Sequence, residues 1–154
     1  MATGGPNQTA TPYPVVDYAP QKQYPSFSTI INQSMLSTVG TITGGTTTVT
    51  ITAAQVLSGL ILHDTSSQAL ADVLPTAALL VPAIEGAQVG STIRFLLRNT
   101  SAGAGTITVS AGTGGTAHGT LSIPYLQQME FLLRVSAVGD TPTYDLYPMG
   151  VVTF

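Results

Sequence analysis

The residues that could do chemistry in this sequence are few. Its only imidazoles are His63, which is followed by Asp64, and His118. A Ser-His-Asp triad could use His63 with a distant serine, but no Gly-x-Ser-x-Gly elbow supports it, and there is no cysteine to act as a nucleophile. The one lysine is Lys22, which excludes a phosphate-binding Gly-x4-Gly-Lys loop. We therefore expect no catalytic residue and no enzymatic activity.

The sequence also contains no clear pattern for metal binding or for acid-base catalysis. The two histidines lack His-Glu-x-x-His or a comparable ligand spacing. Asp64, Asp72, Glu85 and Glu130 could supply the carboxylate pair of a glycosidase, but nothing in the sequence selects two of them. We expect no metal and no cofactor. Both histidines are expected in loops or at strand edges, without a base, metal or nucleophile partner.

A glycine-rich stretch at 111–115 raises the question of a nucleotide-binding loop. It follows a β-prone run, but residues 116–120 are strand-like, whereas a dinucleotide-binding turn must lead into a helix. The glycines are better explained as turn positions that need a positive φ. We predict a turn here and no nucleotide site.

Length and composition place these residues in one globular domain. The chain has 154 residues, 44% hydrophobic and only 7% charged, with a net charge of -3, whereas soluble domains are about 25% charged. This length can bury a core without disulfides, and the hydrophobic fraction excludes global disorder. Low charge suits a protein displayed at high density, because strongly charged neighbours of like sign would repel each other.

Several classes of partner are excluded by the same composition. Four basic residues in the whole chain are too few to neutralise a run of phosphates, so we expect no nucleic acid. The longest apolar stretch, 73–84, is far shorter than a membrane span and contains Pro75 and Pro82. No secretion signal is visible, and the lack of cysteine fits maturation in a reducing cytoplasm.

Residues 1–33 form a segment of different composition from the domain at 34–154. They hold half of the ten prolines and half of the six tyrosines, with no helical or strand period, so we expect an extended N-terminal arm. A disordered tail is the alternative, but interleaved aromatic residues favour an arm that lies against another subunit. The candidate capsid or subunit contacts are Tyr13, Pro14, Tyr18, Tyr24, Pro25 and Phe27.

The rest of the chain reads as short strands separated by turns. We predict strands at 46–51, 93–99, 106–110, 129–137 and 143–147. The second and third are expected to form a hairpin across 101–105, and the last two a pair across 138–142. Many short strands at this spacing predict a mainly β fold, a jelly-roll-like β-sandwich.

Two short helices are expected between the strands. Thr52 and Gln55 have the spacing of a capping box, which predicts a helix over 53–58 ended by Gly59. A second helix should begin near Pro75 and run toward Gly86, and Pro82 should kink or shorten it.

Two of the predicted strands contain the same four-residue motif. The motif Phe-Leu-Leu-Arg occurs at 95–98 and again at 131–134. Alternation then places each Phe and second Leu in the core and the arginines outside. Arg94 and Glu130, which precede the two motifs, could form a cross-strand pair that sets the register.

The order of motifs between 51 and 147 resembles a known family. A capped turn at 52–59 leads into a strand ending in His63-Asp64. Next come Leu-Pro-Thr at 74–76, Gly-x-x-x-x-Phe at 90–95, Asn-Thr-Ser at 99–101 and Gly-Thr-Gly at 112–114. This order is similar to that of the β-rich domain of tailed-bacteriophage head decoration, cement or head-fibre proteins. That family commonly has an arginine where this chain has His63, so a salt bridge at that position is not carried over.

The resemblance implies a virion structural protein that binds the major capsid protein on the outside of an icosahedral capsid, commonly as a trimer. A receptor- or glycan-binding module of a head or tail fibre is the alternative, and a virion hydrolase is a third. We expect a homo-oligomer, because apolar residues gather after the arm and at the end of the sequence. These candidate contacts are Ile30, Ile31, Leu36, Val151, Val152 and Phe154.

Overall fold

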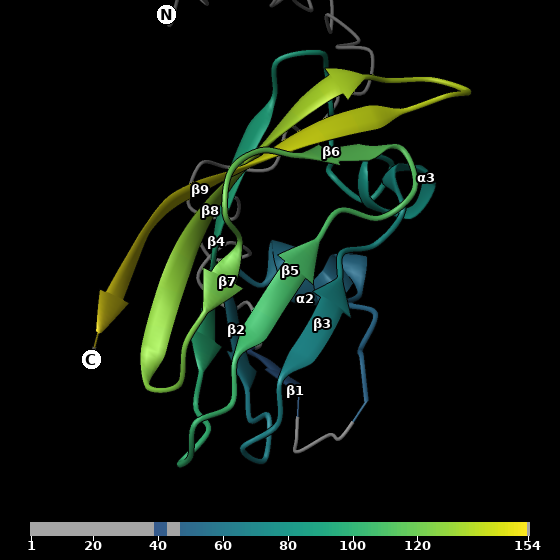
Figure 1. Cartoon of the computed structure of the whole chain (residues 1–154). Coiled ribbons are helices and arrows are strands. Elements are labelled where there is room, and N and C mark those ends of the chain that lie inside the picture. The colour runs from purple at the N-terminus through teal and green to yellow at the C-terminus, as the bar shows by residue number, and fades with distance from the viewer. Residues whose placement is uncertain (1–38, 43–46, 154) are drawn as a thin grey trace, which may run out of the picture. The chain divides into compact units, whose positions relative to one another are not determined.

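Two β-sheets form the framework of the described chain (Figure 1). The computed structural model describes residues 39–42 and 47–153. The predicted arm, and its boundary with the domain, lie outside these residues. The strands are β1 (Gly40–Ile42), β2 (Leu60–His63), β3 (Leu70–Val73), β4 (Thr92–Asn99), β5 (Ile107–Ser110), β6 (Gly115–Ala117), β7 (Ser122–Ile123), β8 (Gln127–Ala137) and β9 (Thr143–Thr153). The prediction of a mainly β fold is confirmed.

Both sheets are mixed. The six-stranded sheet has the order β1-β2-β4-β8-β9-β6, and the three-stranded sheet has the order β3-β5-β7. Within the six-stranded sheet, β4, β8 and β9 are antiparallel, whereas β1, β2 and β4 run parallel and β6 is parallel to β9. β3 is parallel to β5, and β5 is antiparallel to β7. The predicted pairing of the strands at 129–137 and 143–147 is confirmed.

The core lies between the two sheets. Its large side chains come from alternate positions, such as Phe95 and Leu97 on β4 and Phe131 and Leu133 on β8, all fully buried or nearly so. The rings of Phe95 and Phe131 stack with their centres 5.1 Å apart. The predicted inward placement of these four residues is confirmed, because each strand repeats with a period of two.

The two helices are short. α2 (Ala53–Leu57) has the predicted capping box, in which the Gln55 amide donates to the Thr52 hydroxyl and the Thr52 amide donates to the Gln55 side chain. α3 (Ala77–Leu80) is shorter than the predicted helix at 75–86, since Pro82 lacks the N–H that a continuing helix needs.

Two predictions about strands are wrong. β4 and β5 do not form a hairpin, because they belong to different sheets and the chain crosses between layers after Asn99. The predicted strand at 46–51 is reduced, in its described part, to a bridge between Thr50 and Val73. Its Val49 amide donates to the Asp72 carboxylate and not to a neighbouring backbone carbonyl, so the ladder does not extend.

Candidate functional site

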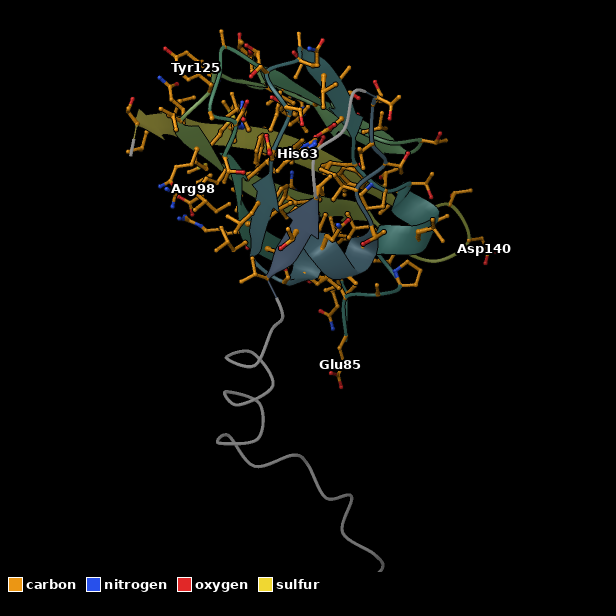
Figure 2. The ribbon with its side chains drawn as sticks, turned by 90° about the horizontal axis from the view of Figure 1, so that it is seen from below. His63, Glu85, Arg98, Tyr125 and Asp140 are labelled. Atoms are coloured by element: carbon orange, nitrogen blue, oxygen red, sulfur yellow. The ribbon has the colours of Figure 1, made fainter. Side chains whose placement is uncertain are left out.

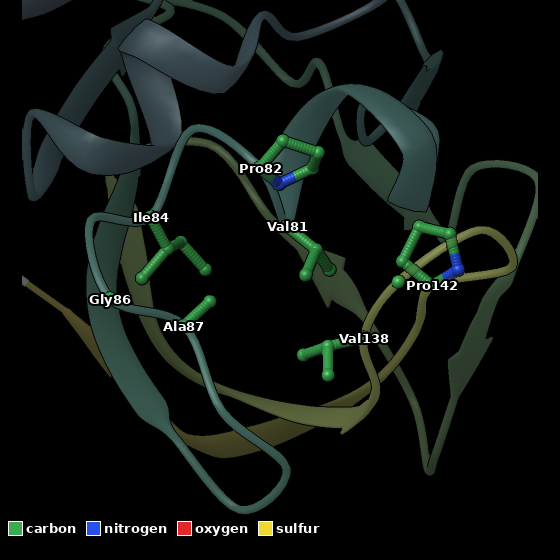
Figure 3. A pocket seen from close by; sticks show the side chains of 8 residues that line it. Val81, Pro82, Ile84, Gly86, Ala87, Val138 and Pro142 are labelled. Atoms are coloured by element: carbon green, nitrogen blue, oxygen red, sulfur yellow. The ribbon is translucent and has the colours of Figure 1, made fainter.

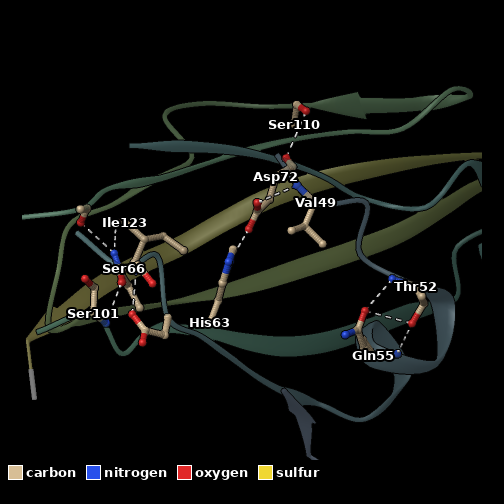
Figure 4. Close-up of polar contacts among 12 residues, drawn as sticks. Val49, Thr52, Gln55, His63, Ser66, Asp72, Ser101, Ser110 and Ile123 are labelled. Carbon is tan, nitrogen blue, oxygen red and sulfur yellow. Dashed lines mark hydrogen bonds and ion pairs between the residues drawn. The ribbon is translucent and has the colours of Figure 1, made fainter. Parts of the chain in front are cut away.

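A buried histidine–aspartate pair joins the two sheets. Nδ1 of His63, the last residue of β2, lies 2.7 Å from Oδ2 of Asp72 on β3, and neither side chain is exposed (Figure 4). With Nδ1 protonated, His63 donates to the carboxylate, and Asp72 also accepts from the Val49 amide at 3.4 Å. Nε2 of His63 has no hydrogen-bond partner among the described residues. The predicted loop or edge position of His63, and its predicted lack of a partner, are therefore wrong.

The full burial of His63 and Asp72 indicates a structural role. A substrate cannot reach either side chain, because both have an exposure of 0%. The pair instead connects the six-stranded sheet to the three-stranded sheet across the core. We therefore interpret His63 and Asp72 as a structural link between the layers.

A second buried polar cluster lies where the chain leaves β4. The Asn99 amide group donates to the carbonyls of Gly105 at 3.0 Å and Ile123 at 3.2 Å, and its oxygen accepts from the Ser101 amide. The Ser101 hydroxyl in turn accepts from the amide of Ser67. Asn99 thus fixes the crossing between the layers, since Ile123 belongs to the three-stranded sheet.

The outer face of the six-stranded sheet is the candidate functional surface. It is the face turned away from the core, and the register places on it leucines from three adjacent strands. Leu60 lies opposite Leu96, and Leu132 lies opposite Tyr147. The outward apolar residues are Leu60, Leu62, Leu96, Leu132, Tyr147 and Val152. We call this set, with the arginines described next, the leucine-arginine face.

All three arginines of the described chain lie on the leucine-arginine face. Arg94 and Arg98 alternate with Leu96 on β4, and Arg134 follows Leu132 on β8. The Arg94 guanidinium lies 3.2 Å from the Glu130 carboxylate, and this predicted pair is confirmed. The side chains are 61% and 42% exposed, so the pair sets register and adds little stability. The face therefore combines apolar area with most of the chain's positive charge.

Two other acidic residues lie away from this face. Glu85 and Asp140 are the two acidic residues that are exposed, and not half-buried or buried, in the described part of the chain. Figure 2 shows Arg98 and Asp140 on opposite sides of the domain, with Glu85 away from both. We call the part of the domain that carries Glu85 and Asp140 the acidic region. It lies apart from the leucine-arginine face, whose three arginines are offset in part by Glu130 and Asp145.

An apolar pocket of about 430 Å³ lies at the acidic region (Figure 3). Its walls come from the segment after α3 and from the turn between β8 and β9, and include Val81, Ile84, Val138 and Pro142. Glu85 lies in the chain between the lining residues Ile84 and Gly86, and Asp140 follows the lining residue Gly139. The pocket has no titratable lining group, so it can bind apolar groups but offers no catalyst.

His118 lies at the surface beside β9. Its ring stacks on Tyr147 with centres 4.5 Å apart, and its Nε2 lies 3.1 Å from the Asp145 carboxylate. His118 also has a carboxylate partner, contrary to the prediction. Its side chain is 42% exposed, and it borders the leucine-arginine face through Tyr147.

The predicted turn at 111–115 is confirmed and is held by a tyrosine. The Gly112 amide donates to the hydroxyl of Tyr144, which donates to the carbonyl of Pro75. Gly114 has a φ of +81°. A Cβ on Gly115 would overlap the Tyr144 ring, so this position requires glycine. Gly115 thus packs against Tyr144, and Gly114 supplies the positive φ of the turn.

Tyr144 predicts a loss of stability at alkaline pH. Burial raises the pKa of its hydroxyl above 10.0, and the hydrogen bond from Gly112 opposes that rise in part. Below pH 10 the hydroxyl is neutral in both states. At higher pH the unfolded chain releases this proton first, so the free energy of unfolding falls until the folded-state pKa is passed. Urea titrations from pH 8 to 11 should show this fall, and Tyr144→Phe should reduce it while costing about 1–3 kcal/mol at pH 8.

Most of the predicted contact residues lie outside the described chain. These are Tyr13, Pro14, Tyr18, Tyr24, Pro25, Phe27, Ile30, Ile31, Leu36 and Phe154. Val151 and Val152 are described, and they are 43% and 58% exposed near the end of β9. In this part of β9 the described residues pair with β8 alone, because β6 reaches only as far as Leu146.

Residues 39–42 and 47–153 contain no group of three or more potential metal-ligating side chains. In the same residues no helix has the length and apolar character needed to cross a membrane. No protein-family model, curated protein or solved structure matches the chain.

Sequence reasoning missed the leucine-arginine face and the buried pair. The runs Leu60-Ile61-Leu62 and Phe95-Leu96-Leu97 were a usable signal, because a strand that is apolar at consecutive positions has apolar side chains on both faces. No comparable signal links His63 to Asp72, because the packing of one sheet against the other is not determined by the local sequence.

Proposed function

We propose that this chain is a virion structural protein that decorates and stabilises the outside of an icosahedral bacteriophage capsid as a homo-oligomer, a trimer. In this proposal residues 1–33 form an extended arm that binds the major capsid protein, and the domain is a jelly-roll-like sandwich. The protein is made in the host cytoplasm and then resides on the outer capsid surface. The resemblance of residues 51–147 to head decoration and head-fibre proteins supports this role.

The leucine-arginine face is the observation that carries the proposal. An antiparallel sheet with one side in water normally has polar residues on that side. Here Leu96, Leu132 and Tyr147 lie there among arginines. Arginine and aromatic residues are enriched in protein interfaces, whereas lysine, which this face lacks, is depleted. Such a face favours a protein that works in contact with other proteins.

Deleting residues 1–27 tests the anchoring role of the arm. Burial of Tyr13, Tyr18 and Tyr24 would contribute on the order of 1.5–3 kcal/mol each before the entropy of ordering is subtracted. The prolines reduce that entropy, because they hold the arm extended. We expect the truncated protein to stay folded and to lose most of its capsid occupancy. Its melting temperature should be unchanged if the arm does not tie subunits together. Purified protein is added to particles that lack it, and the bound copies are counted.

Two variants accompany the deletion. Replacing the three tyrosines by alanine should reproduce much of the loss, because it removes the buried area and keeps the arm. Lys22→Ala is the control, since one exposed charge is worth at most about 1 kcal/mol. Full occupancy by the truncated form would show that the domain alone binds the capsid and that the arm has no anchoring role.

A receptor- or glycan-binding module is the second candidate. The stacked rings of His118 and Tyr147 lie beside the Asp145 carboxylate, and Tyr125 is 46% exposed. Aromatic rings next to carboxylates suit sugar binding. Binding of the full chain to a glycan array, with loss of that binding in Tyr147→Ala, would favour this candidate over capsid decoration.

A further inference from the structure

The described chain holds two surfaces of opposite charge, each with an apolar centre. The leucine-arginine face carries three arginines against two carboxylates, Glu130 and Asp145. The pocket region carries the exposed carboxylates Glu85 and Asp140. No arginine or lysine of the described residues lies outside the leucine-arginine face, so no cationic side chain of residues 39–42 and 47–153 offsets the acids at the pocket.

The other described acids are already engaged. Asp72 is buried against His63, and Asp64 accepts a hydrogen bond from the Ser66 amide within its own turn. Glu130 is paired with Arg94, and Asp145 with His118. Among the acids, the two at the pocket are therefore the ones placed to meet a partner's positive charge.

The pocket also offers apolar area to that partner. Val138 is 42% exposed at its rim, and Leu79 and Val89 are 66% and 61% exposed on the neighbouring segments. A hollow of about 430 Å³ is large enough to receive one long side chain, such as arginine or tyrosine. Both side-chain types lie on the leucine-arginine face.

We propose that the leucine-arginine face of one copy binds the acid-flanked pocket of a second copy, head to tail. Opposite charges then surround apolar centres on both sides of the contact, which is the arrangement that gives an interface its specificity. Because the two surfaces lie on different sides of the domain (Figure 2), each copy can bind one neighbour with each surface. A contact of this kind closes into a ring when its rotation allows.

This inference rests on the homo-oligomer of the proposed function and names the surfaces that form it. Its test uses the mass of the purified full chain in solution and no capsid. Failure of the contact is therefore distinguishable from failure of capsid binding, which is measured by occupancy.

Charge reversal on each surface is the experiment. One variant carries Arg94→Glu and Arg134→Glu, and the other carries Glu85→Arg and Asp140→Arg. Each makes both surfaces alike in charge, so we expect the dissociation constant to rise about 100-fold or more. The pocket variant leaves the sheet untouched, so it remains informative even where the first loses stability through the Arg94–Glu130 pair. Circular dichroism confirms that each variant is folded.

The variant with all four substitutions decides whether the two surfaces meet. Its face is acidic and its pocket is basic, so the same contact forms with the signs exchanged and the oligomer should return. Thr108→Arg, on the exposed side of β5, is a control for added charge and should leave the mass unchanged.

Light scattering at 1–100 μM and low salt gives the result. An oligomeric wild type, two dissociated double variants and a restored fourfold variant would establish the contact. A monomeric wild type would overturn it. An oligomer whose mass is unchanged in both double variants would also overturn it, because the contact would then lie elsewhere. A fourfold variant that remains monomeric would overturn it as well.

Discussion

Asp72→Ala should lower the free energy of unfolding by about 3–5 kcal/mol, a large part of the 5–15 kcal/mol that is usual for a domain. His63 would keep its buried ring and lose the carboxylate at 2.7 Å, so both ring nitrogens would be without a partner among the described residues. The Val49 amide would also lose its acceptor. Urea unfolding followed by circular dichroism measures the effect.

A matched double variant measures how much stability the contact between His63 and Asp72 adds beyond that of each side chain alone. His63→Leu combined with Asp72→Val replaces two buried polar groups by apolar ones of similar volume, which is often close to neutral in other proteins. We expect the double variant to be more stable than either single variant. If the double variant were as unstable as the sum of the two single variants, the pair would contribute no coupling, and the two side chains would act independently.

This expectation could not be drawn from the sequence alone. Without a visible partner, His63 was expected in a loop or at a strand edge. The partner is only nine residues away in the sequence, but it lies in the other sheet. Local pattern determines which residues form strands, whereas the assignment of strands to layers depends on contacts between distant segments.

The features that sequence reasoning predicted correctly are local ones. The capping box of Thr52 and Gln55 acts over three residues, and the inward positions of Phe95 and Phe131 follow from strand alternation. A short turn joins β8 to β9, so β8 pairs with the strand that follows it in the sequence. The pairs that sequence missed are mostly parallel ones, in which intervening segments separate the partners.

The predicted hairpin between 93–99 and 106–110 failed for a reason that can be located. A short loop containing glycine normally joins paired strands. Here Asn99 is fully buried at the end of β4 and bonds the Gly105 carbonyl and the Ile123 carbonyl. These bonds hold the end of the loop beside Asn99, where the chain passes from β4 to the three-stranded sheet. Both edges of β4 are also occupied, by β2 and β8, so β5 has no free edge there. We infer that the Asn99 bonds hold the chain in this crossing.

Asn99→Asp should test that conclusion with almost no change in shape. The two carbonyls that now accept from the Asn99 amide group would face carboxylate oxygens, which cannot donate. Each buried carbonyl without a donor costs about 1–3 kcal/mol, and the buried charge adds to this. We expect the free energy of unfolding at pH 7 to fall by at least about 3 kcal/mol, as measured by urea titration. Thr100→Asp, at the exposed next residue, should change it by no more than about 0.5 kcal/mol.

The pH dependence of this variant identifies the cause. Burial and the two carbonyls raise the pKa of the new carboxyl above its value in the unfolded chain, so the folded state holds the proton to higher pH. Stability is then retained at low pH, where the protonated carboxyl donates to one carbonyl, and is lost as the pH rises through the folded-state pKa. The difference from wild type should therefore shrink as the pH falls from 7 toward 4. A deficit that stayed constant over this range would point to altered packing, and the two donated hydrogen bonds of Asn99 would not be what directs the chain between the sheets.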